Sequence, residues 1–356
     1  MTIIKPGSTI GIIGGGQLGR MSALAAANLG YKVNSFTDKQ NSPASYVSNK
    51  TIVASYDDLE AIDQFTKDVD VVTFEFENIP YKTLQRIENN ILVRPNWQLL
   101  HTSQNRLREK NFINTAGIKT APYTEIRSLD DLKNAHREYN CNSILKTVEF
   151  GYDGKGQYSL NSQSDIEQIW KQINTEVAIL EEKINFSKEI SVIVARGTDG
   201  KSMPFAAAEN YHVNGILSTT IAPANISDEL AIEAKNIAIK LANAFELVGI
   251  LAIEMFVTKN DKILINEIAP RPHNSGHWTM DGCVTSQFEQ FIRAICGLPL
   301  GDCRYHSKVR MINLIGDDVK LWEKHISKPN SKIHLYGKTE IQQGRKLGHI
   351  NELYDN

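Results

Sequence analysis

The sequence predicts an α/β protein that begins with parallel βαβ units and continues into a region of mixed α+β structure. Two observations support this fold class. Strand patterns alternate with helix patterns from the N-terminus to about Val93, and strands separated by helices indicate parallel βαβ units. Later in the chain, Ile250–Val257 and Lys262–Ile268 are strand patterns separated only by a short polar turn, which favours an antiparallel hairpin.

The first part of the chain is expected to fold as one α/β unit that ends near Val93. Thr9–Ile13 has the unbroken apolar pattern of a buried strand, and Gln17–Leu29 has a helical pattern that Gly30 closes. The other elements expected here are strands at Lys32–Phe36, Ile52–Ala54 and Val69–Phe74, an acid-capped helix at Asp57–Lys67 and, after the unit, a helix around Asn96–Asn114.

A glycine-rich loop, a long helix and several strands are expected in the rest of the chain. The loop is Glu149–Gln157, and the amphipathic helix is Asp228–Phe245. Besides the hairpin, strands are expected at Ser143–Lys146, Val177–Glu182, Glu189–Ala195 and Val309–Ile315, and the last of these leads into a small tail.

Composition narrows the classes of function. The chain has 356 residues, enough for two or three domains, and its net charge of −2 gives no support for nucleic acid or an anionic membrane as a main partner. No apolar run reaches the length of a membrane span, and the N-terminus lacks the pattern of a signal peptide. Four cysteines without a C-x-x-C pair indicate reduced thiols and a cytoplasmic protein.

The first glycine loop, Gly14–Gly19, reads GGGQLG and fits the G-x-G-x-x-G pattern of dinucleotide-binding loops. It follows a predicted strand and opens a predicted helix. Asp38 lies about 20 residues further on, where an acidic residue would bind the ribose of NAD. An NAD-dependent oxidoreductase therefore stays open. The alternative is that these glycines only allow a tight turn and close packing of the helix on the sheet.

The second glycine loop joins a strand to a strand and is suited to phosphate. Its three glycines leave backbone N–H groups free to wrap phosphate oxygens, and Lys146 and Lys155 add positive charge. It is not a Walker A loop, because no G-K-[ST] precedes a helix. The strand that follows ends in Glu181–Ile184, where backbone groups could meet a purine edge and a carboxylate a ribose. A flexible hairpin and solvated charges are the alternatives.

Two glutamates are expected to face each other across the predicted hairpin. If the turn places Lys259 opposite Lys262, counting back places Glu254 opposite Glu267 on the same face. Like charges in this position are destabilising. Mg²⁺ resolves the conflict, because it binds one or two carboxylates together with substrate phosphates. A slipped register with one glutamate in water, or a proton shared by the pair, would also remove the repulsion.

Polar residues crowd the segment Ile265–Trp278, INEIAPRPHNSGHW, which begins as the second hairpin strand. Arg271 and His273 follow the strand end, where a transferred phosphoryl group would arrive. Arginine suits bidentate hydrogen bonding to phosphate or carboxylate, and the prolines restrict the backbone around it. Taken alone, His273 or His277 is better explained as a hydrogen-bonded loop histidine. The whole cluster, following a metal pair, favours a functional site.

These features together resemble the ATP-grasp superfamily. The motifs GGGQLGRM, FEFENI, EFGYDGKGQ, INFSKEIS, INEIAPRPHNSGHW and GRKLGH resemble, within it, the synthetases that make N5-carboxyaminoimidazole ribonucleotide. The resemblance covers essentially the whole chain in the expected order. It implies an ATP-grasp fold with an N-terminal Rossmann-like pre-ATP-grasp domain over residues 1–100, an ATP-grasp domain over 101–300 with a lid at about 118–184, and a small β-rich C-terminal domain over 301–356.

The resemblance also implies a reaction. Bicarbonate attacks the γ-phosphate of ATP to give carboxyphosphate, and the amine of aminoimidazole ribonucleotide then takes the carboxyl group, a step of purine biosynthesis. ATP and Mg²⁺ are the implied cofactors, and a cytoplasmic homodimer without nucleic-acid or membrane partners is implied. A related ligase that uses formate with glycinamide ribonucleotide, and a non-enzymatic nucleotide-binding regulator, remain alternatives.

The resemblance finally implies roles for individual residues. The expected ATP contacts are Arg106, Lys146, Gly151, Tyr152, Asp153, Gly154, Lys155, Gly156, Gln157, Glu181, Glu182, Lys183, Ile184, Glu189, His212, Asn266 and Glu267. The expected ribonucleotide contacts are Gln17, Leu18, Glu75, Tyr152, Asp153, Lys338, Arg345 and Lys346. Glu254 and Glu267 would bind Mg²⁺, and Arg271, His273 and Asn274 would hold carboxyphosphate. Ala269 stands where many ATP-grasp enzymes have a metal-binding asparagine, which leaves the number of Mg²⁺ ions open.

Overall fold

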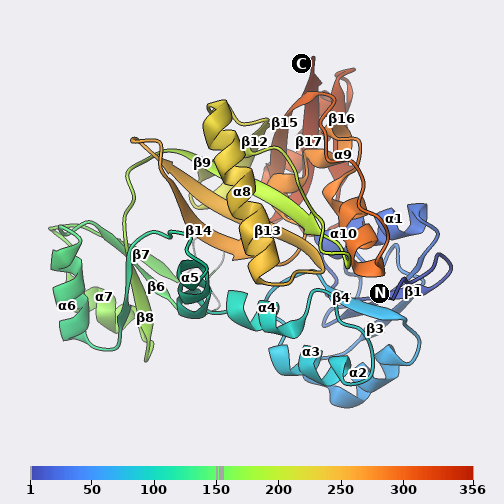
Figure 1. The fold of residues 1–356 in the computed structure, drawn as a ribbon, viewed down its shortest axis with the longest axis horizontal. Helices are drawn as coiled ribbons and strands as arrows, with labels where there is room; N and C mark the ends of the chain where they lie inside the picture. The colour runs from blue at the N-terminus through green and yellow to red at the C-terminus, as the bar shows by residue number, and fades with distance from the viewer. Residues whose placement is uncertain (1, 150, 152–155, 356) are drawn as a thin grey trace.

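Three β-sheets organise the described part of the chain, and helices cover them (Figure 1). The structure is a computed structural model that describes residues 2–149, 151 and 156–355. Within these residues, the N-terminal sheet has four strands, the central sheet has nine, and a separate small sheet has four.

The N-terminal sheet is parallel and has the strand order β3-β2-β1-β4. Its strands alternate with helices, so the expected βαβ units are confirmed. The strands β1 and β4 are buried almost throughout and rich in Ile and Val, as parallel strands covered on both faces usually are. The elements are β1 (Thr9–Ile13), α1 (Gln17–Asn28), β2 (Lys32–Thr37), β3 (Lys50–Val53), α2 (Leu59–Thr66), β4 (Val71–Phe74) and α3 (Tyr81–Glu88).

The prediction of a single helix around residues 96–114 is wrong, because two helices occupy this stretch. They are α4 (Trp97–Ser103) and α5 (Arg106–Thr115). Between them Asn105 has an extended backbone, and its side-chain oxygen accepts the N–H groups of Leu107 and Arg108, both at 3.1 Å. An asparagine that caps a helix in this way starts a new one. The break places Arg106 at the first position of α5.

The central sheet is antiparallel, with the order β14-β13-β9-β11-β12-β15-β17-β16 and with β10 paired to β9. Alternate residues of β9 face opposite sides. Val192 and Val194 pack with the buried side of α8, whereas Ile193 packs in the cluster that contains residues of α10. The elements here are β9 (Phe186–Arg196), β10 (Ser202–Pro204), β11 (Ala208–Val213), β12 (Ile216–Ala222), α8 (Asp228–Ala244), β13 (Gly249–Thr258), β14 (Ile263–Ala269), η1 (Asn274–Gly276), α9 (Thr279–Gly282) and α10 (Gln287–Cys296).

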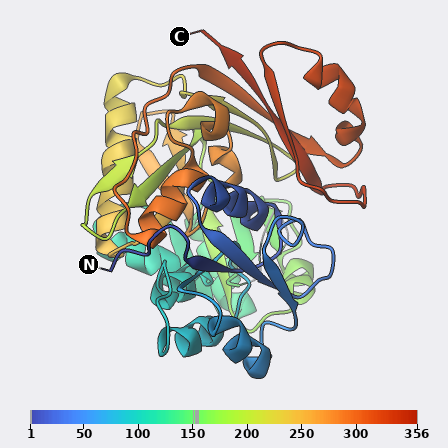
Figure 2. The ribbon, with the colours of Figure 1, turned by 90° about the vertical axis from the view of Figure 1, so that its right-hand side faces the viewer.

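The C-terminal segment extends the central sheet instead of trailing from it. Figure 2 shows its strands, in red, beside the central elements. β12 pairs with β15, which pairs with β17. The loop after β16 returns to the N-terminal unit, where Gly337 lies close to Tyr46. The elements are β15 (Lys308–Ile315), η2 (Gly316–Leu321), α11 (Trp322–Ile326), β16 (Ser331–Leu335) and β17 (Lys346–Tyr354).

The small sheet stands apart from the other two in Figure 1 and has the antiparallel order β5-β8-β6-β7. Two helices, α6 and α7, contribute to its own hydrophobic core. The strands β6 and β7 flank the second glycine loop, as the sequence predicts. The elements are β5 (Tyr123–Ile126), α6 (Leu129–Glu138), β6 (Ser143–Thr147), β7 (Gln157–Leu160), α7 (Ile166–Ile173) and β8 (Ala178–Glu182).

Two expectations about the chain as a whole can be compared with the fold. The four cysteines, Cys141, Cys283, Cys296 and Cys303, all have free thiols, which agrees with the expected reduced state. Among the described residues, no helix has both the length and the apolar character needed to cross a membrane.

Candidate active site

Ion pairs join distant parts of the sequence near β13 and β14. Arg106, at the start of α5, pairs with Glu267 of β14 at 3.1 Å between Nη1 and Oε2. Arg271, just beyond β14, pairs with Glu77 of the N-terminal unit at 2.7 Å. The structure thus brings α5, the N-terminal unit and the end of the hairpin to one place. Glu77 was not predicted, although it belongs to the same FEFEN motif as Glu75.

The hairpin places Glu254 directly opposite Glu267, so this predicted register is confirmed. The predicted pairing of Lys259 with Lys262 is wrong, because Thr258 donates its backbone N–H to the carbonyl of Lys262 at 2.9 Å. The loop is one residue longer than predicted. A β-bulge between residues 254 and 255, in which Asn266 has no partner on β13, restores the glutamate pairing. Two deviations of one residue therefore cancel.

The two glutamates have different electrostatic surroundings. Burial and the like charge of Glu267 raise the pKa of Glu254 from 4.5 to about 7. Burial also acts to raise the pKa of Glu267, but Arg106 and then Lys146 lower it overall. A pair in which one carboxylate resists ionisation suits a divalent cation, which would favour the charged form of both.

A buried charge cluster lies beside the pair. Lys146 of β6 and Lys110 of α5 approach the carboxylate of Glu181 on β8, at 2.8 and 3.5 Å. Burial acts to raise the pKa of Glu181, but the two lysines lower it to about 2. Lys110 also donates to the carbonyl of Asn266 at 3.2 Å and thus ties the cluster to the bulge. Sequence reasoning missed Lys110, because a lysine in a helix usually indicates an exposed side.

The predicted nucleotide residues of β8 are partly engaged by the protein itself. The backbone N–H groups of Glu182 and Lys183 donate to Pro122 and Asn142, at 2.9 and 3.1 Å. Ile184 follows them and is half-buried. These hydrogen bonds fix the end of β8, where the backbone groups that are predicted to face the purine begin.

Part of the second glycine loop can be placed. The carbonyl of Gly151 accepts from Arg106 at 3.4 Å, and Gln157 pairs with Lys146 across β6 and β7. Gly156 has φ +68, and a Cβ there would lie 2.8 Å from the Thr147 hydroxyl, so only glycine fits. The predictions for Tyr152, Asp153, Gly154 and Lys155 lie outside the described residues.

Glu189 and His212 form a further ion pair, on neighbouring strands. Glu189 Oε2 lies 2.5 Å from His212 Nδ1. Burial acts to lower the pKa of His212, but the hydrogen bond to Glu189 and the charge of Glu254 raise it overall. This pair was predicted among the ATP contacts, and it lies within the electrostatic reach of the glutamate pair.

The segment after β14 presents three polar groups. His273 Nε2 lies 3.4 Å from Glu254 Oε1. Burial, and then Arg271 and Lys346, lower the pKa of His273 well below its usual value, so its imidazole is neutral. Both side-chain amide atoms of Asn274 are buried without a hydrogen-bond partner. Buried amides are normally paired, so this amide is available to a polar ligand.

The first glycine loop is filled by a carboxylate of the protein. Glu75 accepts the backbone N–H of Gly19 at 2.8 Å and that of Gly16 at a shorter distance. A Cβ at Gly14 would lie 2.2 Å from Glu75, which explains a glycine there. The N–H groups at the start of α1 are those that would bind a dinucleotide phosphate. The structure therefore does not favour the hypothesis that the chain binds NAD. Asp38 is left without the role in ribose binding that the sequence suggested.

The remaining ribonucleotide candidates lie around the same loop. Gln17 starts α1, and Leu18 packs its side chain with Phe288 and Tyr336. Lys338 donates to the carbonyl of Lys346 at 2.8 Å. Arg345 pairs with Glu340 at 3.4 Å and keeps about a third of its side chain exposed. Burial raises the pKa of Glu75 overall, whereas the charges of Arg271 and Lys338 act to lower it, which places both cations near this carboxylate.

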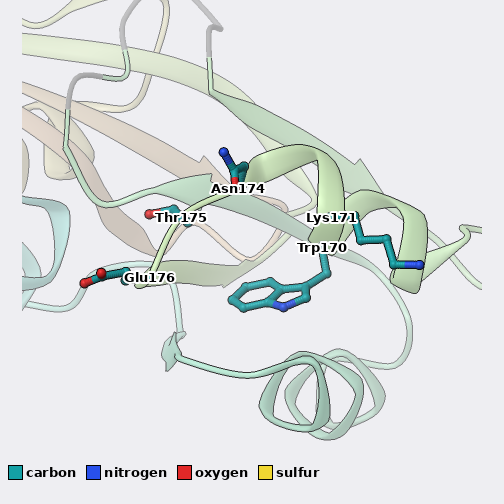
Figure 3. Close-up of a pocket in the computed structure, with 5 residues that line it drawn as sticks. All are labelled: Trp170, Lys171, Asn174, Thr175 and Glu176. Carbon is teal, nitrogen blue, oxygen red and sulfur yellow. The ribbon is translucent and has the colours of Figure 1, made fainter.

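Hollows in the surface do not identify the site. The one in Figure 3 lies at the end of α7 and is lined by Trp170, Lys171, Asn174, Thr175 and Glu176. Another lies between α8 and the hairpin turn. Neither is lined by a predicted site residue. In the described part of the chain, no group of three or more His, Cys, Asp or Glu side chains can hold a metal by itself.

Comparisons with known families follow the three parts of the chain. A ribonucleotide synthetase preATP-grasp domain matches residues 7–104, and an ATP-grasp domain matches residues 111–288. A phosphoribosylaminoimidazole carboxylase C-terminal domain matches residues 310–356. The predicted fold class is thereby confirmed.

Comparisons with individual proteins cover nearly the whole chain. An N5-carboxyaminoimidazole ribonucleotide synthase of Bacillus subtilis is 45% identical over 98% of this chain and 92% of its own length. A bifunctional purine synthesis protein, purC/E of Dictyostelium discoideum, is 44% identical over 98% of this chain, which spans 37% of that longer protein.

Solved structures give the same result. A crystal structure of an ADP complex of N5-carboxyaminoimidazole ribonucleotide synthetase has a TM-score of 0.97 and 48% identity, and covers 100% of this chain and 95% of that one. A synthase of Aspergillus clavatus in complex with ADP and 5-aminoimidazole ribonucleotide has a TM-score of 0.91 and 32% identity, and covers 98% of this chain and 94% of that one.

Proposed function

This chain belongs to the N5-carboxyaminoimidazole ribonucleotide synthetase family of ATP-grasp enzymes, and from that premise we propose what it does and which residues do it. It carboxylates 5-aminoimidazole ribonucleotide with bicarbonate at the expense of ATP. The products are N5-carboxyaminoimidazole ribonucleotide, ADP and phosphate, in purine biosynthesis. The observation that carries the proposal is the match over nearly the whole chain, which includes a relative solved with ADP and the acceptor ribonucleotide.

ATP binds between the small sheet and the central sheet. Arg106 and Lys146 supply positive charge to its phosphates, and the loop of Gly151–Gln157 is assigned to bind them through its backbone N–H groups. The strand end Glu181–Ile184 receives the adenine and ribose, with Glu189, His212 and Asn266 on the side of the central sheet. The support for this assignment is the convergence of the ion pairs of Arg106 and Lys146 on the hairpin and β8.

Glu254 and Glu267 hold Mg²⁺ together with the phosphates. The fit rests on two carboxylates paired across strands, one with a pKa raised to about 7 by burial and its neighbour. Mg²⁺, when bound, neutralises charge on the phosphates during transfer. The protein's own part is to hold both carboxylates in register, which the bulge at Asn266 achieves.

Arg271, His273 and Asn274 hold the carboxyphosphate. A bicarbonate oxygen forms a bond to the γ-phosphorus as the bond to ADP breaks. The assignment is supported by the buried amide of Asn274, which has no hydrogen-bond partner, and by the guanidinium of Arg271, which Glu77 holds just beyond β14. Groups that bind charge developing in the transition state contribute most to such a step.

The acceptor ribonucleotide binds at the first glycine loop. Gln17 contributes its side chain and Leu18 its backbone, since the Leu18 side chain is buried with Tyr336. Glu75 fixes the loop through Gly16 and Gly19 and faces the ribose. Tyr152 and Asp153, which lie outside the described residues, are the further contacts proposed for the ribonucleotide. The amine nitrogen forms a bond to the carboxyl carbon and loses a proton, while the bond from that carbon to the phosphate oxygen breaks and phosphate leaves. The phosphate group of the ribonucleotide itself is bound by Lys338, Arg345 and Lys346.

A substrate panel tests the function. ADP release is measured with aminoimidazole or glycinamide ribonucleotide, each with bicarbonate or formate. Only aminoimidazole ribonucleotide with bicarbonate is expected to give ADP together with a carboxylated product. Turnover of glycinamide ribonucleotide with formate would refute the proposal in favour of the related formate ligase.

The family resemblance also supports an assembly and a location. We expect a cytoplasmic homodimer, in which the three domains span residues 1–100, 101–300 and 301–356 with a lid at about 118–184. Light scattering across a dilution series measures the mass directly, and a mass that stays that of one chain at every concentration would contradict the dimer.

A further inference from the structure

We propose that a buried hydrogen-bond relay across the central sheet fixes His273 in the neutral tautomer that carries its proton on Nε2. The relay runs from Thr220 through Asn210, Ser191 and Ser275. These four are positioning residues for His273, which would contact the carboxyphosphate. The inference extends the proposed function and rests on it for its catalytic consequence, but not for the tautomer itself.

The backbone gives the first reason. His273 precedes η1, and the N–H of Ser275 donates to His273 Nδ1 at 3.3 Å. A backbone N–H can only donate, so this contact favours the tautomer in which Nδ1 presents its lone pair, and the relay adds to that preference. A neutral imidazole with an acceptor at Nδ1 has its hydrogen on Nε2. That nitrogen lies 3.4 Å from Glu254 Oε1.

The hydroxyl of Ser275 gives the second reason. It lies 2.8 Å from His273 Nδ1 and accepts from Ser191 Oγ, also at 2.8 Å. Because Ser275 already accepts from Ser191, its own hydrogen is free to point at Nδ1. Both hydrogen bonds are buried, since Ser191 and Ser275 are each 1% exposed. Water therefore has little access to reverse their direction.

The direction of the chain is set further along the sheet. Asn210 Nδ2 donates to Ser191 Oγ at 2.9 Å, and Thr220 Oγ1 donates to Asn210 Oδ1 at 2.9 Å. An amide has distinct donor and acceptor ends, so its orientation sends every hydrogen in the chain toward His273. Asn210 and Thr220 face each other on β11 and β12.

The register of the sheet explains why the relay reaches the site. On β9, Ser191 is directly opposite Glu254 of β13. Asn210 of β11 is directly opposite Glu189 of β9, so the relay reaches Ser191 by a diagonal step of two residues along β9. The relay thereby arrives at the residue that faces the proposed metal ligand. Gln287 holds the backbone of His273 from the other side, accepting its N–H at 2.9 Å and donating to its carbonyl at 2.8 Å.

The consequence is chemical. With hydrogen on Nε2, His273 offers a hydrogen-bond donor toward Glu254 and the carboxyphosphate. Nε2 then has no lone pair that could take a proton, and the lone pair of Nδ1 is engaged by Ser275. The residue therefore binds the intermediate and is not the general base for the ribonucleotide amine.

The tautomer can be read directly by NMR. In protein labelled with ¹⁵N-histidine and without substrates, long-range ¹H–¹⁵N spectra distinguish the protonated ring nitrogen from the unprotonated one. The signals of His273 are those missing in His273→Gln. We expect a protonated Nε2 and an unprotonated Nδ1. A protonated Nδ1, or an imidazolium pattern at neutral pH, would overturn the proposal.

Two variants test the relay. In Asn210→Asp the new carboxylate can only accept, so Ser191 must turn its hydrogen toward β11, and the Nδ1–H form of His273 should appear. Ser191→Ala breaks the chain without adding charge and should give a mixture of forms, so it tests the relay if the first variant fails to fold. Unchanged His273 signals in a folded variant would overturn the proposal.

Controls separate the relay from general damage. Ser187→Ala removes a hydroxyl from the same strand, one that donates to the Val257 carbonyl at 3.0 Å and lies outside the relay. It should leave the His273 signals unchanged. His277 is an internal control, because its Nδ1 lies 3.0 Å from Gln287 Nε2 and is not reached by the relay. Its signals should stay constant in Ser191→Ala.

Turnover gives the second measurement. Ser191→Ala should lower kcat by about 10- to 100-fold, the usual cost of losing a group that orients a catalytic side chain, with KM for Mg-ATP unchanged. A shifted tautomer with unchanged kcat would leave the relay standing and overturn the role of His273 in the proposed function. An equal rise in KM would place the relay in the ATP site and contradict the proposal.

Discussion

The strongest test of the glutamate pair is the change Glu254→Gln in the absence of metal. Glutamine keeps the shape of the side chain but removes the charge that faces Glu267 across the hairpin. We expect the variant to be more stable than the wild type at alkaline pH, although it should lose activity. A gain in stability combined with a loss of function is what a site held under electrostatic repulsion predicts.

The magnitude follows from the pKa of Glu254, which burial and then Glu267 raise from 4.5 to about 7. Between these values the folded protein binds more protons than the unfolded chain, so stability falls as pH rises through this window. The loss is complete above the higher value. At about 1.4 kcal/mol per tenfold change in proton affinity, the upper limit lies between about 3 and 4 kcal/mol. Because Glu267 keeps 43% of its side chain exposed, solvent reduces this to about 1–3 kcal/mol.

The assay is thermal unfolding with a chelator at pH 5 and at pH 8. Glu254→Gln should raise Tm by about 2–6 °C at pH 8 and much less at pH 5. Added Mg-ATP should stabilise the wild type more than the variant.

Glu352 is a matched control of opposite sign. Burial acts to raise its pKa, but hydrogen bonds from Lys328 and Tyr354 lower it overall. Its stabilising effect is present above the unfolded pKa and fades as the pH falls through the folded one, so Glu352→Gln should lower Tm at pH 8. The reasoning about Glu254 is refuted if Glu254→Gln lowers Tm at pH 8, or raises it equally at both pH values.

Three further predictions concern single sites. Arg271→Lys keeps the charge but loses the two-pronged donor, so kcat should fall about 10²–10³-fold while calorimetry finds the affinity for Mg-ATP unchanged; a parallel loss of affinity would move Arg271 to the nucleotide site. Calorimetry with NAD and NADP should detect no binding at sub-millimolar concentration, since Glu75 fills the first glycine loop; tight binding of either would revive the dinucleotide reading. Lys110→Met removes one of the two cations that pair with buried Glu181, so the free energy of unfolding, measured with denaturant at neutral pH, should fall by about 1–3 kcal/mol. An unchanged midpoint would mean that Lys146 alone compensates this carboxylate.

The local sequence pattern was sufficient to predict many of the helices and strands. The strand Thr9–Ile13 and the helix after it have their boundaries in the sequence, because an apolar run and a glycine turn act over a few residues. The long helix α8 was predicted within one residue for the same reason. The helix break at Asn105 was missed, since an asparagine is tolerated inside helices and acts as a cap only when its side chain turns back on the backbone.

What the sequence by itself determined is the set of chemical groups and their order: two glycine loops, a strand with Glu254, a strand with Glu267, and the segment that carries Arg271 and His273. Only the tertiary structure decided which groups meet. The glutamates face each other through a longer turn and a compensating bulge, and neither can be read from spacing alone.

The same holds for contacts between elements that are distant in sequence. Lys110 reaches Glu181 from another part of the chain, and Ser191 acquires its position in the relay from the strands on either side of it. Spacing along the chain fixes which residues share a face of one helix or strand. Pairing between strands, and the burial that follows, depends on packing free energy summed over the whole molecule, so it appears only once the chain has folded.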